Sequence, residues 1–100
     1  MTSISFSEFR KLFPFSVVEI IVQDKKNRFL LTKRANTPYK NKWHFPGGIV
    51  ERNTSLEKMV KIIAKRELNL NVKIDKFVGV YESILPERHD ISHLYIVHIT

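Results

Sequence analysis

The sequence predicts a domain of the α/β class, α+β in type, in which one long helix packs on a mixed β-sheet. Three observations lead to this prediction. β-Branched apolar segments occur before and after a helical segment, the helix carries one apolar stripe, and Pro-Gly-Gly separates the first strands from the helix. The chain has 100 residues, 43% apolar and 27% charged, so we predict a single domain over residues 1–100.

The first third of the chain predicts a short helix and a β-hairpin. Residues 5–13 carry Phe and Leu at helical spacing, and Pro14 ends that helix. Residues 16–23 (SVVEIIVQ) are β-branched and almost wholly apolar, which is typical of a buried strand. A turn at 24–27 then leads into a second strand at 28–34.

A glycine-containing segment follows the hairpin. Residues 35–42 form a polar loop, and residues 43–51 form a short strand that the turn Pro46-Gly47-Gly48 interrupts. Two glycines let the backbone come close to a ligand, and the N-terminus of a following helix attracts anions. A tight turn without a ligand is the alternative for the glycine pair alone.

Residues 55–68 form the longest predicted helix. Thr54 and Glu57 have the spacing of a capping box, in which Thr54 caps the first turn. The apolar stripe of this helix comprises Leu56, Met59, Val60, Ile63, Ala64 and Leu68. Two further strands are predicted at 72–82 and 91–99, with Pro86 and its polar neighbours connecting them.

Composition limits the classes of site and partner. Because the chain has no cysteine, a metal would need oxygen or imidazole ligands, which favours Mg²⁺ or Mn²⁺. No apolar run approaches the roughly 18 residues of a membrane span, and no signal peptide is evident, so we expect a cytoplasmic protein without a membrane partner. The net charge is +7, concentrated between Lys25 and Lys42. This basic stretch is either a solvated surface or attracts phosphates; nucleic acid is the weaker hypothesis because no recognition motif accompanies it.

Residues 29–70 (FLLTKRANTPYKNKWHFPGGIVERNTSLEKMVKIIAKRELNL) resemble a Nudix domain, the fold of a superfamily of hydrolases that act on pyrophosphate-linked nucleotides. The resemblance extends over roughly residues 14–99. With Gly48 in register, the loop Glu of the consensus falls on Thr54 and the Arg-Glu pair on Ile62-Ile63. The Glu-Glu pair falls on Arg66-Glu67 and the late Gly on Asn69. One carboxylate therefore remains where the consensus has several, and a multi-metal mechanism is not expected.

The reduced motif resembles that of the GDP-mannose mannosyl hydrolases, which also lack the Arg-Glu pair and keep the last Glu. The resemblance implies a Mg²⁺-dependent hydrolase of a nucleoside diphosphate sugar, in which water attacks the anomeric carbon and the nucleoside diphosphate leaves. It implies Glu67 and the Gly47 carbonyl as metal ligands, Arg34 and Gly48 as substrate-binding residues, and Arg34 and Glu19 as catalytic residues.

Each assignment has an alternative. Glu67 is otherwise a solvated helix residue, Arg34 a surface charge, and Glu19 a side chain that points outward from an edge strand. Loss of carboxylates also favours a non-catalytic module that binds a nucleotide or a protein.

The sequence ends in strand-like residues, whereas the resembled domain continues with another strand, a loop and a helix. We therefore expect an incomplete domain. Apolar side chains of the strand 91–99, namely Leu94, Ile96 and Ile99, are expected to be exposed, with unpaired backbone along an edge. Both features predict a homodimer or aggregation.

Overall fold

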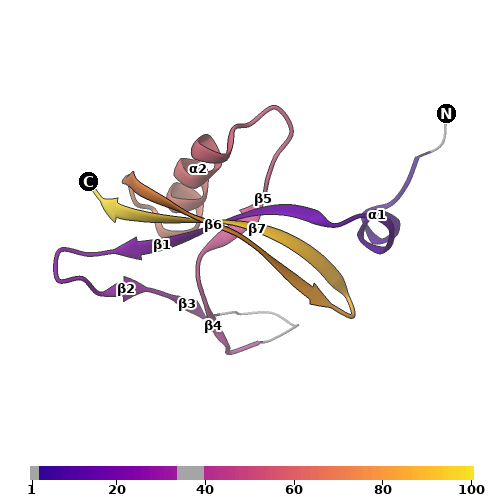
Figure 1. The fold of residues 1–100 in the computed structure, drawn as a ribbon, viewed down its shortest axis with the longest axis horizontal. Coiled ribbons are helices and arrows are strands. Elements are labelled where there is room, and N and C mark those ends of the chain that lie inside the picture. The colour runs from indigo at the N-terminus through magenta and orange to yellow at the C-terminus, as the bar shows by residue number, and fades with distance from the viewer. Residues whose placement is uncertain (1–2, 34–39) are drawn as a thin grey trace.

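The computed structural model describes residues 3–33 and 40–100 and confirms the α+β class with a mixed sheet (Figure 1). The helices are α1 (Phe6–Leu12) and α2 (Leu56–Leu68). The strands are β1 (Phe15–Gln23), β2 (Phe29–Leu30), β3 (Thr32–Lys33), β4 (Trp43–His44), β5 (Gly47–Ile49), β6 (Val72–Leu85) and β7 (Arg88–Ile99).

β1 and β7 form the middle of the sheet. They run parallel to each other, and β6 pairs antiparallel with the other edge of β7. The remaining edge of β1 is shared by two short antiparallel strands. β5 pairs with Val17–Glu19, and β2 pairs with Val22 and Gln23. The predicted single strand at 28–34 is therefore wrong: β2 belongs to this sheet, whereas β3 pairs with β4 in a separate one.

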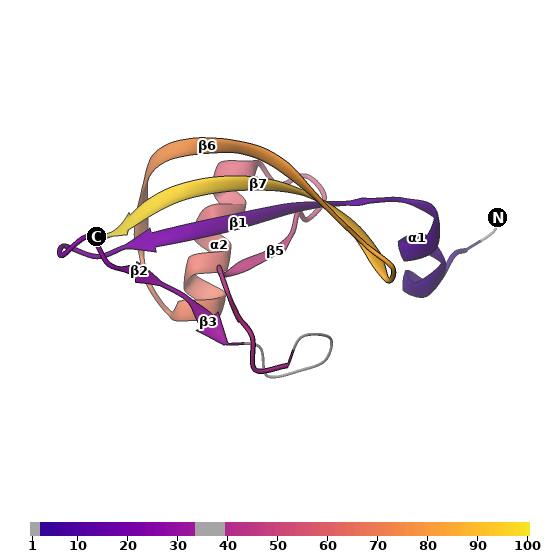
Figure 2. The same ribbon diagram turned by 60° about the horizontal axis from the view of Figure 1, so that its bottom comes forward.

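α2 covers one face of the sheet, as Figure 2 shows. Val18, Ile20 and Val22 alternate along β1 and are fully buried against the helix. From the helix, the core contains Met59, Val60, Ile63 and Ala64, and from β6 and β7 it contains Val72, Tyr95 and Val97. By the same alternation, Glu19 lies on the opposite face of the sheet.

The caps of α2 differ from the predicted ones at the N-terminus. Ser55, not Thr54, is the N-cap, and its hydroxyl accepts a hydrogen bond from the Lys58 amide at 3.1 Å. The Thr54 hydroxyl instead donates to the Arg52 carbonyl at 3.3 Å. At the other end, Asn69 is left-handed (φ 54°), the conformation that often ends a helix.

The hairpin of β6 and β7 is longer than the predicted strands at 72–82 and 91–99. Only Pro86 and Glu87 separate the two strands, and Leu85 pairs with Arg88. Polar side chains close to the turn interact with one another. Across the hairpin, the His89 Nε2 atom lies 2.9 Å from a Glu82 carboxylate oxygen. Within β7, the Arg88 Nε atom lies 2.8 Å from Asp90.

α1 packs on the sheet through aromatic rings. None of its residues is buried, and Phe6 and Phe9 stack on Phe15 at centroid distances of 5.3 and 5.4 Å.

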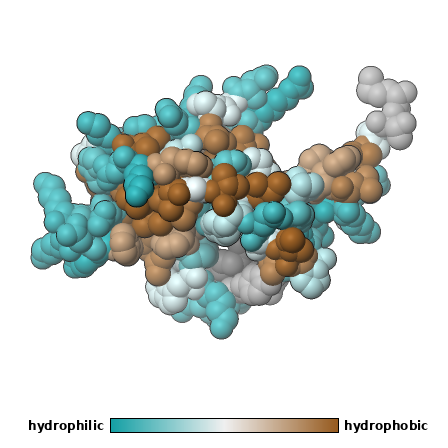
Figure 3. All heavy atoms as spheres, in the orientation of Figure 1, coloured by the Kyte–Doolittle hydropathy of each residue, from teal (hydrophilic) through white to brown (hydrophobic). Residues whose placement is uncertain are grey.

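Apolar residues gather in the middle of the face shown in Figure 3, where β6 and β7 overlap in Figure 1. In the described ranges, neither helix has the length and hydropathy of a membrane span.

Candidate functional site

Gly47 and Gly48 lie in a strand and not in the predicted turn. Both belong to β5, where Gly47 pairs with Glu19 and Gly48 with Val18. A Cβ atom at Gly47 would lie 2.9 Å from the Val18 carbonyl oxygen, closer than Cβ contacts normally are. Gly47 therefore permits the close approach of β5 to β1.

The two glycines face opposite sides of the sheet. A Cβ at Gly48 would meet the Arg66 guanidinium at 2.9 Å and the Ile63 side chain at 3.6 Å, both on α2. A Cβ at Gly47 would meet the Glu19 side chain at 3.0 Å. A charged side chain therefore lies on each side of β5, Arg66 on the α2 side and Glu19 on the opposite side.

On the α2 side, Arg66 lies between two carboxylates. Its Nη1 atom is 3.2 Å from Glu51 Oε1, and its Nε atom is 3.9 Å from Glu67 Oε1. The three side chains are about half exposed: 49% for Arg66, 55% for Glu51 and 45% for Glu67. Water weakens each pair, so they stabilise the fold little, but together they hold one guanidinium over Gly48.

On the opposite side, Glu19 accepts two hydrogen bonds. Ser92 donates to one carboxylate oxygen at 3.3 Å, and the Tyr81 hydroxyl donates to the other. Partial burial, followed by this hydrogen bond to Glu19, raises the pKa of Tyr81 to about 12, so the hydroxyl remains a donor at neutral pH. Glu19 is half-buried on an interior strand, which excludes the alternative of an outward-pointing residue on an edge.

The structure brings together some of the predicted residues. Gly48 and Glu67 share the Arg66 side chain as a neighbour, and Gly47 and Glu19 are paired. Glu19 and Glu67 lie on opposite sides of the β1–β5 pair. Arg34, the predicted phosphate-binding residue, lies outside the described residues.

Sequence reasoning missed the partners of these residues. Arg66 was recognised only as a position where a carboxylate is absent, and Glu51 was not considered. The only sequence signal for Arg66 and Glu51 was that each is a charged residue close in the chain to Gly48 or Glu67. No sequence signal could have joined Tyr81 and Ser92 to Glu19, because they lie 62 and 73 residues away.

The side chains of the described residues do not make a metal site by themselves. Among residues 3–33 and 40–100, no group of three or more His, Cys, Asp or Glu side chains could hold an ion. The Gly47 backbone does point away from β1, because the hydrogen bonds of this ladder join Ile20 to Pro46 and Val50 to Ser16. Glu67 and one carbonyl are too few ligands for an octahedral cation, so phosphate oxygens would have to supply others.

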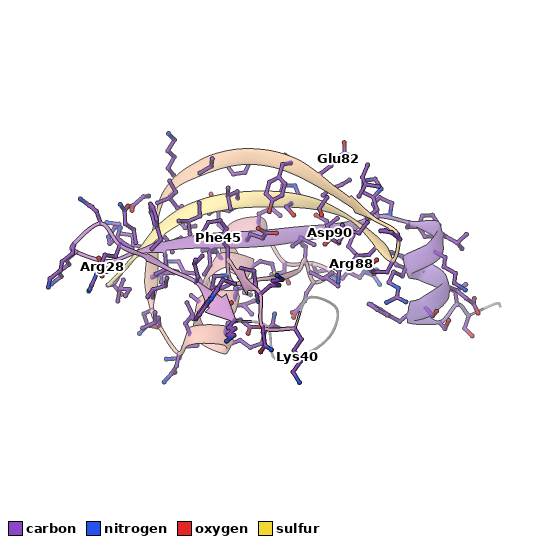
Figure 4. The ribbon with its side chains drawn as sticks, turned by 90° about the horizontal axis from the view of Figure 1, so that it is seen from below. Arg28, Lys40, Phe45, Glu82, Arg88 and Asp90 are labelled. Atoms are coloured by element: carbon purple, nitrogen blue, oxygen red, sulfur yellow. The ribbon has the colours of Figure 1, made fainter. Side chains whose placement is uncertain are left out.

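A cavity of about 690 Å³ lies elsewhere, at the β1–β2 turn, where it is lined by residues 23–28 and by Asp75, His98, Ile99 and Thr100. Its lining includes none of the candidate site residues. Figure 4 shows Arg28 of this turn at the end of the molecule away from Arg88 and Asp90.

Known proteins resemble this chain in sequence and in fold. The family model described as "NUDIX domain" matches residues 14–99. An ADP-ribose pyrophosphatase of Methanocaldococcus jannaschii is 37% identical over 92 residues, covering 88% of this chain and 53% of that protein. A low-salt glycan biosynthesis protein of Haloferax volcanii is 30% identical over 69 residues, or 69% of this chain and 44% of that protein. The chain thus spans about half the length of these curated relatives.

Solved structures show the same fold. A NUDIX hydrolase from Nitrosomonas europaea has a TM-score of 0.75 and 31% identity, covering 87% of this chain and 48% of that chain. A MutT NUDIX hydrolase from Burkholderia pseudomallei has a TM-score of 0.81 at 23% identity and covers 88% of this chain and 70% of that chain. The second likeness concerns the fold alone.

Proposed function

Because the chain belongs to the NUDIX domain family, we propose that it binds and hydrolyses a nucleoside diphosphate sugar at the site beside Gly48. The observation that carries the proposal is the contact between β5 and the last turn of α2. It holds the Arg66 guanidinium over the Gly48 backbone, with Glu67 3.9 Å from Arg66, and a guanidinium beside a close-packed backbone suits a diphosphate.

The proposed roles follow the residues of the site. Members of this family generally use divalent metals such as Mg²⁺. In this chain, Mg²⁺ or Mn²⁺ would be held jointly by the substrate phosphates, Glu67 and the Gly47 carbonyl, and it would neutralise charge on the diphosphate. Gly48 and Arg34 contribute to substrate binding, and Arg34 stabilises charge on the leaving diphosphate. Glu19, which accepts hydrogen bonds from Tyr81 and Ser92, acts near the reacting sugar. Because Glu19 and Glu67 lie on opposite sides of the β1–β5 pair, this role requires the sugar to extend past β5 to the face that carries Glu19.

The cleaved bond distinguishes two forms of this proposal. In the GDP-mannose form, water adds to the anomeric carbon, the bond to the diphosphate oxygen breaks, and GDP and mannose are released. The similarity to an ADP-ribose pyrophosphatase suggests instead that water adds to a phosphorus atom, which would release AMP and ribose 5-phosphate. Chromatography of the products from GDP-mannose and ADP-ribose decides between these two forms.

The site is tested by the variant Glu67→Gln. We expect the wild-type chain to bind Mg²⁺ in the presence of GDP or ADP-ribose and only weakly without it, and the variant to lose this nucleotide-dependent binding. Isothermal calorimetry measures both. Glu57→Gln removes an equal charge from the exposed first turn of the same helix and serves as the control. Equal Mg²⁺ binding by the wild type and Glu67→Gln would exclude Glu67 as a ligand.

A second function is nucleotide binding without hydrolysis. It is favoured by Ile63 and Arg66, which occupy helix positions where the consensus has carboxylates; Ile63 is fully buried and Arg66 is cationic. Saturable nucleotide binding without product formation from either substrate would support this function over catalysis.

A further inference from the structure

Arg66 is the cation of the Gly48 site. Its guanidinium would lie 2.9 Å from a Cβ on Gly48, so it sits directly over the glycine backbone. Both of its neighbouring carboxylates contact it, Glu51 at 3.2 Å and Glu67 at 3.9 Å. One positive charge therefore occupies the space that these two carboxylates share.

This arrangement is unfavourable for the binding of a free metal ion on the same face of α2. A divalent cation held by Glu67 and water alone binds weakly, and Glu51 is the second carboxylate beside the same guanidinium. A cation entering between them would have to displace Arg66 and would be repelled by it. The described residues offer no group of three ligating side chains that could offset this repulsion.

We propose that Arg66 is the resident cation of this site and that it excludes free divalent ions from Glu51 and Glu67. The proposal rests on the proposed function in taking the Gly48 surface as the site. The guanidinium lies beside both carboxylates in the free chain, and its forked donors face a diphosphate that approaches Gly48. A metal ion then enters only with phosphate groups, which supply ligands and also attract Arg66 away from the carboxylates.

The test is Mn²⁺ binding to the purified chain without nucleotide, followed by electron paramagnetic resonance. The wild-type chain should show no saturable binding at millimolar Mn²⁺. Arg66→Glu places a third carboxylate beside Glu51 and Glu67 and should tighten Mn²⁺ binding by about tenfold or more, with Arg66→Gln intermediate.

Lys65→Glu is the matched control, because Lys65 is exposed, adjacent in α2, and the charge change is identical. It should bind Mn²⁺ no better than the wild-type chain. Equal gains in Lys65→Glu and Arg66→Glu, no gain in folded Arg66→Glu, or saturable binding by the wild-type chain would each overturn the proposal. If Arg66→Glu does not fold, Arg66→Gln should still bind Mn²⁺ more tightly than the wild-type chain, and no gain in Arg66→Gln would then overturn the proposal. Because no nucleotide is present, the result is independent of whether the chain hydrolyses a nucleoside diphosphate sugar.

Discussion

Gly47 and Gly48 are adjacent in β5, yet a side chain at each would meet a different kind of neighbour. At Gly47 the nearest atom to an added Cβ is the Val18 carbonyl oxygen, which belongs to the backbone of an interior strand. At Gly48 it is the end of the Arg66 side chain, which can move aside. The two positions therefore differ in how the surrounding structure can respond to a methyl group.

We predict that Gly47→Ala lowers the free energy of unfolding by about 1–3 kcal/mol, the usual effect of overpacking, because β5 or β1 must shift. Gly48→Ala should change it by less than about 1 kcal/mol, since displacing Arg66 is offset by the reduced entropy of the unfolded chain. Chemical denaturation of both variants measures the difference. Equal losses would mean that Arg66 is as rigidly held as the backbone.

Tyr81 provides a second prediction for a single residue. Its pKa is raised from 10.0 to about 12 by burial and by the hydrogen bond to Glu19, so the folded chain holds this proton longer than the unfolded chain. The stabilisation from this contact is complete below pH 10 and is lost as pH rises through about 12. Tyrosinate absorbance of the wild type minus that of Tyr81→Phe should show one group titrating near 12. A difference curve centred near 10 would contradict the Glu19 contact.

In α2, the local sequence predicts the helix itself, whereas the folded structure determines which residue is its N-cap. Its apolar stripe and its length were evident from periodicity. Its N-cap depends on whether the hydroxyl of Thr54 or of Ser55 reaches an amide of the first turn. Ser55 does so, while Thr54 bonds back to the carbonyl of Arg52.

We predict that Ser55→Ala destabilises the chain by about 1 kcal/mol, the usual effect of removing an N-cap, because the Lys58 amide loses its acceptor. Thr54→Ala should have an effect of less than about 0.5 kcal/mol, because Thr54 is only partly buried and does not cap the helix. Thermal unfolding of the pair measures both. A larger effect for Thr54→Ala would restore the predicted capping box.

At the scale of the whole molecule, the edge of the sheet is β6 and not β7. β7 pairs with β1 and β6 along its length, so the expectation of unpaired backbone at residues 91–99 was wrong. Leu94, Ile96 and Ile99 are half-buried and not exposed. Within the sheet, exposed large apolar side chains gather on β6 instead, among them Val80 at 56% and Ile84 at 70% exposure. A long edge strand with apolar side chains favours pairing with another chain.

We therefore still predict that the 100-residue chain self-associates, now through β6. Val80 and Ile84 are four residues apart in a strand and lie on the same face, so Val80→Lys with Ile84→Lys should shift the chain toward monomer. Light scattering across a concentration series measures this shift, with Ser3→Lys and Ser7→Lys together as the control for two added charges at exposed positions. A wild-type monomer at all concentrations would contradict self-association.

The sequence alone determined the features that depend on short-range pattern. Apolar residues that recur every 3.6 residues indicate α2, and β-branched runs indicate β1, β6 and β7. The interval from Gly48 to Glu67 identifies the family motif with its missing carboxylates. These features were predictable because each depends on neighbours a few residues apart or on a fixed spacing in the chain.

Only the tertiary structure decided which groups meet. Gly47 and Gly48 form a strand because the edge of β1 has an open segment at Val17–Glu19, and local turn propensity could not reveal that partner. The contacts of Glu19 with Tyr81 and Ser92 depend on the register of three strands. Arg66 acquires its position over Gly48 from the docking of α2 on the sheet. Each depends on packing between distant segments, which no local pattern encodes.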